Sequence, residues 1–270
     1  MVELIHISDL HYGSREFRED CLFNVIDYIN EYRPDAVICT GDITHKAKKT
    51  QYEGIAAFLE KIKVPLLIVP GNHDVKNNGL IFFERFIGPR RSTMKIEDKD
   101  TFIMGLRSPR DNTSEGELGD SQLDWMVQQL RNCQNNLRIM ALHHHLIPVP
   151  FAGVKRNTLI DAGEALVITQ EYDIDLVLMG HRHCPHIWRF GDSVLIYCGT
   201  SCSDKVRADD TQSFNQISLY EDQLEVTVVD SLTLNKNLLI SQKRGKIDYI
   251  RSRRNRIDHL MQTKIFQDTV

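Results

Sequence analysis

Short apolar runs alternate with helix-spaced apolar stripes along the first half of the chain. The apolar runs predict strands over residues 3–8, 36–40, 64–69, 101–106 and 137–142. The stripes predict three amphipathic helices, built on Leu22, Val25, Ile26 and Ile29, on Ile55, Phe58, Leu59 and Ile62, and on Leu123, Met126, Val127 and Leu130. Pro34 should end the first helix. This order predicts βα units with parallel strands.

The second half of the chain changes from helices to strands. A helix over Asp161 to Glu171 and a strand over Ile174 to Met179 continue the first pattern. Four further strands follow, at residues 186–190, 193–198, 214–220 and 224–229. The first two of these flank Gly191-Asp192, a dipeptide suited to a two-residue hairpin turn. The chain is therefore predicted to be an α/β protein with hairpins in its later part.

The last residues differ in composition, so we predict one domain over residues 1–235 and a tail over residues 236–270. The segment from Lys243 to Arg256 is strongly basic, and Ile250, Ile257 and Met261 could form the apolar edge of a helix. A solvated helix packed on the domain or on a second subunit is favoured over a nucleic-acid-binding arm, because a run of charge alone is weak evidence.

Composition narrows the class of protein. The 270 residues carry a net charge of -4, which argues against general nucleic-acid binding by the whole body. The six cysteines form no CxxC pair, so we expect reduced thiols. No secretory signal and no apolar stretch near the roughly 20 residues of a membrane span is visible. We therefore predict a cytoplasmic protein without a membrane span.

Five short polar segments follow apolar runs and carry the candidate chemistry. They are Ser8 to His11, Gly41-Asp42, Gly71 to Asp74, His143 to His145 and Gly180 to His183. In a sheet of βα units, all five would meet at the carboxyl ends of the strands, where ligand sites of such sheets lie. Singly, Asp9 or Asp42 could cap a helix, and Asn72 or Asp74 could form a turn. Five such segments together favour one site, whereas His6 and His186 receive no role.

The residue types in these segments predict metal binding. Asp9 and His11 are two residues apart, as are His181 and His183, so in extended backbone each pair could close on one ion. Carboxylate, amide and imidazole ligands suit Mn, Fe, Co or Zn, and the lack of cysteine argues against a closed structural zinc site. Seven candidate ligands fit two ions better than one. The candidates are Asp9, His11, Asp42, Asn72, one histidine of the triplet, His181 and His183.

The ordered motifs D-L-H, G-D, G-N-H-D, H-H and G-H-x-H resemble those of the calcineurin-like metallophosphoesterases over Glu3 to about Asp230. Within that family, HISDLHYG, ALHHH and GTSCSDKVR look most like the class III cyclic-nucleotide phosphodiesterases of bacteria. The resemblance implies a four-layer α/β/β/α sandwich, in which two mixed β-sheets are flanked by helices.

The resemblance also implies a role for each motif residue. Asp9, His11 and His183 would hold one metal and Asp42 would bridge. Asn72, His143 and His181 would hold the second metal. Two divalent ions are expected, with Mn or Fe favoured and Zn, Co or Mg as alternatives. His73 would be the general acid, and Asn72, His73 and Thr200 could contact substrate.

Two positions depart from the usual pattern of the family. Alignment with A-L-H-H-P favours His143 over His144 as the ligand and puts His145 where relatives have proline. His145→Ala is therefore expected to be mild. His45 stands where phosphatase relatives often have an Asp that supports the general acid, which leaves the support of His73 open. We expect the His45 side chain to be exposed.

The predicted function is hydrolysis of a small phosphodiester by a metal-bridging hydroxide, with 3′,5′-cyclic AMP as the first candidate. A DNA nuclease and a nucleotide-lipid pyrophosphatase of the same superfamily are alternatives with the same chemistry. A noncatalytic scaffold of the same fold is the alternative from another class. The sequence leaves homo-oligomer formation open.

Overall fold

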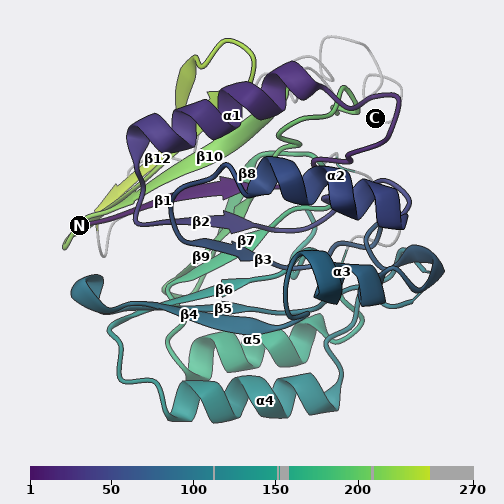
Figure 1. Cartoon of the computed structure of the whole chain (residues 1–270). Helices are drawn as coiled ribbons and strands as arrows, with labels where there is room; N and C mark the ends of the chain where they lie inside the picture. The colour runs from purple at the N-terminus through teal and green to yellow at the C-terminus, as the bar shows by residue number, and fades with distance from the viewer. Residues whose placement is uncertain (112, 151, 153–157, 208–209, 244–270) are drawn as a thin grey trace, which may run out of the picture.

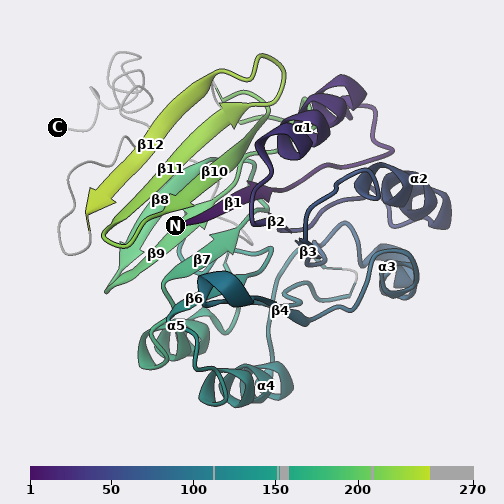
Figure 2. The ribbon, with the colours of Figure 1, turned by 60° about the vertical axis from the view of Figure 1, so that its left-hand side comes forward.

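The computed structural model describes residues 1–111, 113–150, 152, 158–207 and 210–243. This part of the chain forms two six-stranded sheets packed face to face, with helices on their outer sides (Figures 1 and 2). The strand order is β12-β11-β10-β1-β2-β3 in the first sheet and β4-β5-β6-β7-β9-β8 in the second. The predicted sandwich of two sheets flanked by helices is therefore confirmed.

The elements follow the alternating pattern of the sequence. The strands are β1 (Val2–Ile7), β2 (Ala36–Cys39), β3 (Leu66–Ile68), β4 (Ser92–Ile96), β5 (Thr101–Gly105), β6 (Leu137–Ala141), β7 (Leu176–Met179), β8 (His186–Phe190), β9 (Ser193–Tyr197), β10 (Ser213–Leu219), β11 (Gln223–Asp230) and β12 (Lys236–Lys243). The helices are α1 (Glu19–Tyr32), α2 (Lys49–Leu59), α3 (Leu80–Phe86), α4 (Asp120–Arg131) and α5 (Ala162–Glu171), with short 3₁₀ helices η1 (Lys76–Asn78) and η2 (Glu97–Lys99).

Both sheets are mixed, and their parallel parts set the position of the site. Strands β1, β2 and β3 are parallel neighbours in the first sheet, whereas β10, β11 and β12 pair antiparallel. Strands β5, β6, β7 and β9 are parallel neighbours in the second sheet, with antiparallel β4 and β8 at its edges. Parallel neighbours end at the same edge of a sheet, so the segments that follow them are brought together.

Alternation within β1 shows how the layers hold together. Successive side chains of a strand point to opposite faces. Ile5 and Ile7 pack with the helices that cover the first sheet, whereas Val2 and Leu4 pack in the core between the sheets. Helices α4 and α5 cover the outer face of the second sheet, as Figure 1 shows. Burial on both faces explains why these strands are nearly continuous apolar runs.

The predicted helices form, although their ends differ. Helix α1 buries the expected stripe, and Pro34 follows its left-handed C-cap residue Arg33, whose N–H binds the Ile29 carbonyl. Helix α2 ends at Leu59, so Ile62 lies beyond it while still packing against the same core. None of the helices in the described part of the chain has the length and apolarity that crossing a bilayer requires.

Three elements were not predicted from the sequence. Helix α3 has only seven residues, and half-exposed β4 is an edge strand without a fully buried face. Strand β12 corrects the boundary at residue 235, because Lys236–Lys243 pairs along β11 as the edge of the first sheet and is not helical. The rest of the predicted tail, residues 244–270, lies outside the described residues, so its helical character stays a prediction.

Candidate metal centre

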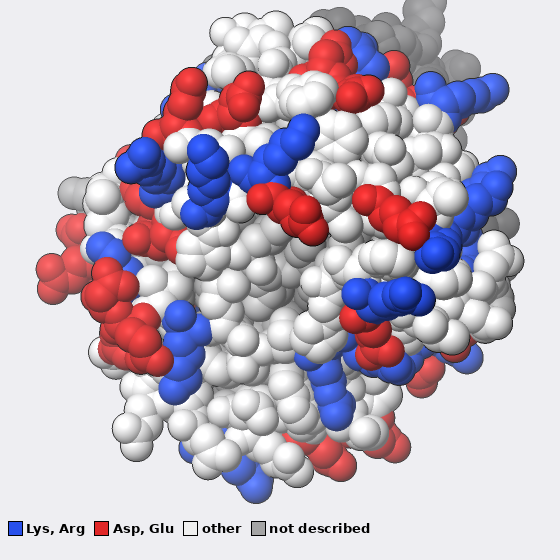
Figure 3. Space-filling view, in the orientation of Figure 1, with Lys and Arg blue, Asp and Glu red and all other residues white. Residues whose placement is uncertain are grey.

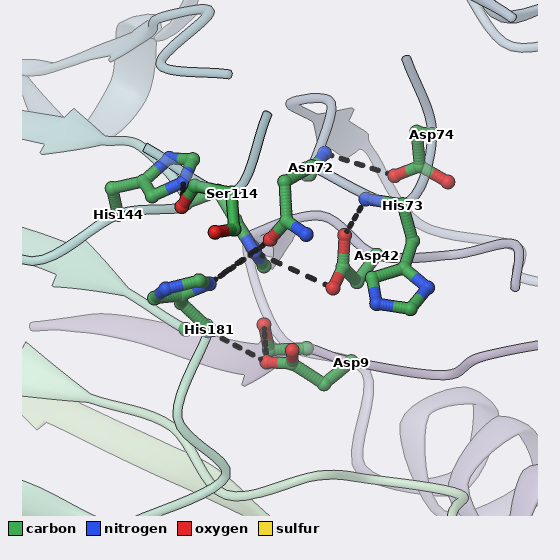
Figure 4. Close-up of polar contacts among 12 residues, drawn as sticks. Asp9, Asp42, Asn72, His73, Asp74, Ser114, His144 and His181 are labelled. Carbon is green, nitrogen blue, oxygen red and sulfur yellow. Dashed lines mark hydrogen bonds and ion pairs between the residues drawn. The ribbon is translucent and has the colours of Figure 1, made fainter. Parts of the chain in front are cut away.

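The carboxyl ends of five strands supply the polar side chains of the candidate site (Figure 4). Asp9 and His11 follow β1, Asp42 follows β2, and the segment Asn72-His73 follows β3. From the second sheet, the histidine triplet follows β6, and the histidines of the G-H-R-H segment follow β7. The structure thus brings all five predicted segments together.

The backbone adopts a left-handed conformation at several of the residues whose side chains form the site. Asp9, His11, Asp42, His181 and His183 all adopt positive φ, between 51° and 75°. This left-handed conformation costs an ordinary residue about 1–2 kcal/mol, so the surrounding fold must enforce it. The expectation of extended backbone at these pairs is therefore wrong. The spacing argument that each pair closes on one ion fails for His181 and His183, which face different ligand groups, the grouping that the family resemblance implies.

Gly41 shows how closely the loops approach one another. Its φ is +92°, and a Cβ built on it would lie 2.5 Å from the backbone nitrogen of Gly71. Only a residue without a side chain fits this approach of the G-D loop to the G-N-H-D loop.

The first ligand group contains Asp9, His11 and His183. The Nε2 atoms of the two histidines are 3.0 Å apart, and Asp9 Oδ1 lies 3.2 Å from His183 Nε2. Asp9 Oδ1 is buried and makes no hydrogen bond to a described residue. Ligand atoms held at roughly 2.1 Å around one cation lie about 3 Å from each other. The orphaned oxygen and the spacing therefore fit a divalent ion.

The second ligand group contains Asn72, His143 and His181. Asn72 Oδ1 lies 3.1 Å from His143 Nε2 and 3.0 Å from His181 Nδ1, and these two nitrogens are 3.2 Å apart. Figure 4 shows His181 and Asn72 pointing toward each other above Asp9. An amide oxygen with two imidazoles is again a donor set for a borderline divalent ion.

Asp42 lies between the two groups. Its Oδ2 is 3.9 Å from His11 Nε2 and 3.5 Å from His143 Nε2, so one oxygen faces both sides. Its other oxygen, Oδ1, accepts a 2.7 Å hydrogen bond from the His73 N–H. This second bond fixes the plane of the carboxylate.

Backbone carbonyls orient two of the histidines from behind. The Nδ1 atom of His143 lies 2.7 Å from the Thr40 carbonyl, and that of His183 lies 2.5 Å from the Lys205 carbonyl. A carbonyl only accepts, so each Nδ1 carries the hydrogen and each Nε2 presents a lone pair to its ligand group. Such outer partners are typical of metal-binding histidines.

The charges of the buried ligand groups depend on one another. At His143 burial would lower the pKa, but the neighbouring Asp42 and Asp9 outweigh it and the net shift is upward, so a bound cation would displace a proton there. Burial lowers the pKa of His11 to about 3, so its ring is neutral. Burial alone would raise the pKa of Asp42, but the neighbouring His143, His73 and His11 outweigh it and the net shift is downward. Deprotonated carboxylates and neutral imidazoles are the forms that bind metal.

The histidine triplet divides into three environments. His143 joins the second ligand group, as the alignment favours, whereas His144 lies between Ser108 Oγ, 2.9 Å from Nδ1, and the Ser114 carbonyl, 3.3 Å from Nε2. His145 is fully buried, and its Nε2 donates to the Gly180 carbonyl at 2.8 Å. His145 thus ties the triplet to the G-H-R-H segment, which argues against a mild effect of its removal.

His73 lies at the edge of the site and is half-buried. Its Nδ1 donates to the His45 carbonyl at 2.7 Å, and its ring stands edge-on to His11 with the centroids 4.8 Å apart. The main chain of residue 45 therefore supports His73, whatever the side chain there. The His45 ring is only partly exposed, because it packs against His73.

Two residues differ from their expected roles. Thr200, a predicted substrate contact, is fully buried and donates its hydroxyl to the Asp9 carbonyl at 2.6 Å, so it holds the loop from behind. Asp74, for which the sequence suggests only a turn, accepts hydrogen bonds from the N–H groups of Ile43, Thr44 and Gly71. It joins the G-D loop to the G-N-H-D loop. In the sequence, only its place at the end of G-N-H-D could have indicated this role.

The chain belongs to the calcineurin-like phosphoesterases, whose family pattern matches residues 2–185. The predicted family and enzyme class, a metal-dependent phosphoric ester hydrolase, are therefore confirmed. The family uses divalent metals, and the His and Asp groups described above are able to hold them.

Two relatives and one solved structure show the range of similar proteins. A probable cyclic nucleotide phosphodiesterase of Vesicomyosocius okutanii is 29% identical over 187 residues, which are 67% of this chain and 78% of the relative. A probable glycerophosphodiester phosphodiesterase of Arcobacter nitrofigilis is 27% identical over 222 residues, 76% of this chain and 80% of the relative. A dimetal phosphatase from Danio rerio has a TM-score of 0.68 at 12% identity and covers 90% of this chain and 99% of its own, a likeness of fold.

Proposed function

We propose that the chain is a dinuclear metal-dependent phosphodiesterase that hydrolyses a small phosphodiester. The position of Asp42 carries this proposal, because its Oδ2 lies within 3.9 Å of a nitrogen from each ligand group. A carboxylate placed in this way is suited to bridge two ions. Asp9, His11 and His183 would hold one ion, and Asn72, His143 and His181 the other.

The bound ions would supply a water-derived nucleophile near neutral pH and would neutralise phosphate oxygens. His73 would act on the leaving oxygen. Its Nδ1–H is used by the His45 carbonyl, so Nε2 is the atom available to substrate. Transfer of the Nε2 proton to the leaving alkoxide would leave a neutral ring that still donates to that carbonyl.

The names of the relatives support a small diester as substrate. One relative is named for cyclic nucleotides and the other for glycerophosphodiesters. We therefore propose 3′,5′-cyclic AMP as the first substrate to test and glycerophosphodiesters as the second. On the face seen in Figure 3, positive and negative side chains are interspersed, so that face offers no extended basic track for a nucleic acid.

The test measures hydrolysis of bis(4-nitrophenyl) phosphate by protein loaded with Mn, Fe, Co or Zn. Asp42→Asn should reduce the metal content and lower the rate about 10³-fold, because bound metals contribute several kcal/mol to stabilising the transition state. Asp27→Asn, which alters an exposed carboxylate on α1, is the matched control. Wild-type protein that binds these metals without turnover would contradict the proposal. Full activity of Asp42→Asn with a single bound ion would contradict the dinuclear arrangement.

A further inference from the structure

A cavity of about 410 Å³ opens beside the first ligand group. Its walls are three loops that contribute residues 11, 13–16, 45–46, 203 and 205. His11 lines the cavity and also belongs to the ligand group, and His45 lines it while packing on His73. The cavity therefore continues from the side of the site where His73 would meet the leaving oxygen.

The walls of this cavity are tied to one another. The Gln51 side chain accepts a hydrogen bond from the Lys46 N–H and donates one to the Gly13 carbonyl. The Asp204 N–H donates to the Glu16 carbonyl at 2.8 Å, which joins the third loop to the first. A cavity held in this way needs little reorganisation to bind a ligand.

The cavity carries positive charge that its own residues do not neutralise. Glu16 is its one carboxylate among the described lining residues, and Arg15 Nε already occupies it at 2.6 Å. Lys46 and Lys205 also line the cavity, and within the described chain neither has a carboxylate oxygen within 4.0 Å. Two lysines thus line the cavity without a described carboxylate partner.

Lys76 adds a third positive charge beside His73. Its Nζ lies 3.0 Å from His73 Nδ1, but that nitrogen carries the hydrogen given to the His45 carbonyl and has no lone pair for the ammonium. Burial lowers the pKa of Lys76, the charges of Asp42 and Asp74 raise it, and those of Lys205 and Lys46 lower it, with a net downward shift. Lys205 and Lys46 therefore lie close enough to Lys76 to repel it, and an anion among the three lysines would relieve this repulsion.

The lining also limits what the anion can be attached to. In the described part of the chain, the cavity is lined by histidine, glycine, serine and charged residues, with no aliphatic side chain and no Phe, Tyr or Trp. A purine ring would find no apolar wall there, whereas phosphate oxygens match lysine ammonium groups well.

We propose that Lys46, Lys76 and Lys205 form a second anion subsite, which binds a phosphate carried by the leaving alcohol of the substrate. This inference rests on the proposed function, because it places the leaving group next to His73. To the two substrates proposed above it adds a third class to test, diesters whose leaving group bears its own phosphate. A 3′,5′-cyclic nucleotide, with a single phosphate at the metals, would leave this subsite empty.

The experiment compares propylphosphonate with propane-1,3-bisphosphonate, and the corresponding six-carbon pair, on metal-loaded protein. Each compound is measured by calorimetric binding and as an inhibitor of bis(4-nitrophenyl) phosphate hydrolysis. In the wild type, one bisphosphonate should bind at least about tenfold more tightly than its monophosphonate, equivalent to about 1.4 kcal/mol. Lys46→Gln/Lys205→Gln should bring this ratio close to one. Lys63→Gln, an exposed lysine outside the cavity, should leave the ratio unchanged.

The outcomes separate the subsite from the proposed function. Equal binding of both members of each pair by the wild type would overturn the subsite, even if the diester is hydrolysed. A ratio that persists in Lys46→Gln/Lys205→Gln would also overturn it. A lysine-dependent ratio in protein that hydrolyses no diester would support the subsite and overturn the phosphodiesterase proposal instead.

Discussion

The ligand cluster and the lysine-lined cavity lie side by side but differ in how the charges of their side chains are balanced. In the cluster, the buried His11 and Asp42 take the neutral and ionised forms that metal binding needs, and backbone carbonyls fix the rings of His143 and His183. In the cavity, exposed Lys46 and Lys205 have no described counter-charge. The fold itself therefore sets the ring orientations and charges of the ligand cluster. The lysines of the cavity lack a described carboxylate partner, and under our proposal an external anion would balance their charge.

This difference explains which of the two regions the sequence could reveal. The metal ligands lie in short segments directly after adjacent strands. Motifs such as D-L-H or G-N-H-D can therefore be recognised in the sequence alone. The lysines come from three separate loops and share no spacing. Only the folded chain shows that Lys46 and Lys205 line one cavity and that Lys76 lies beside His73.

The largest effect expected within the cluster comes from His143→Ala. Loss of His143 Nε2 removes an imidazole 3.1 Å from Asn72 Oδ1, so the second group should no longer hold its ion. Diester hydrolysis should fall about 10³-fold, and metal content measured by mass spectrometry should drop by one ion.

His144→Ala is the control for that substitution. It removes the neighbouring ring, which bonds to Ser108 and Ser114 rather than to the ligand group, and should retain both ions. Loss of metal from His144→Ala but not from His143→Ala would contradict the register of the triplet.

His73→Asn should have a smaller effect that depends on the leaving group. For an alkyl diester, kcat should fall about 10²-fold, which is the usual contribution of a general acid. For bis(4-nitrophenyl) phosphate the loss should be slight, because 4-nitrophenolate leaves without a proton. Metal content should be unchanged. Equal losses with both leaving groups would show that His73 acts otherwise, for example by binding the phosphate.

The fold could be predicted well where both faces of a strand are buried, as in β1 and β2, because the apolar runs are unmistakable. It could not be predicted for β12, whose exposed Lys236 and Asn237 resemble a tail and which is a strand only because β11 pairs with it. At the site, the motifs indicated the ligand residues. The grouping of His181 and His183 on different sides depends on left-handed backbone that sequence spacing does not show.

His145→Ala tests whether the cluster is held by more than its ligand atoms. His145 is fully buried and binds the Gly180 carbonyl, so its loss leaves both a cavity and an unpaired acceptor. The free energy of unfolding should fall by about 2–4 kcal/mol, as urea denaturation would measure. His145→Gln, which keeps an N–H donor, should recover part of this loss. Unchanged stability of His145→Ala would restore the milder expectation from the sequence.

The last prediction concerns pH and the buried His6, which hydrogen-bonds to Thr40 between the sheets. Burial lowers its folded-state pKa from 6.5 to about 3. Between these values the unfolded chain binds a proton that the folded chain does not, so stability falls as the pH is lowered from 6.5 toward 3. In His6→Gln, measured with wild type under excess chelator, this slope should be smaller by up to about 1.4 kcal/mol per pH unit. Lys63→Gln, which changes an exposed side chain instead of the buried His6, should leave the slope unchanged. Parallel slopes for wild type and His6→Gln would mean that His6 takes up its proton in the folded state.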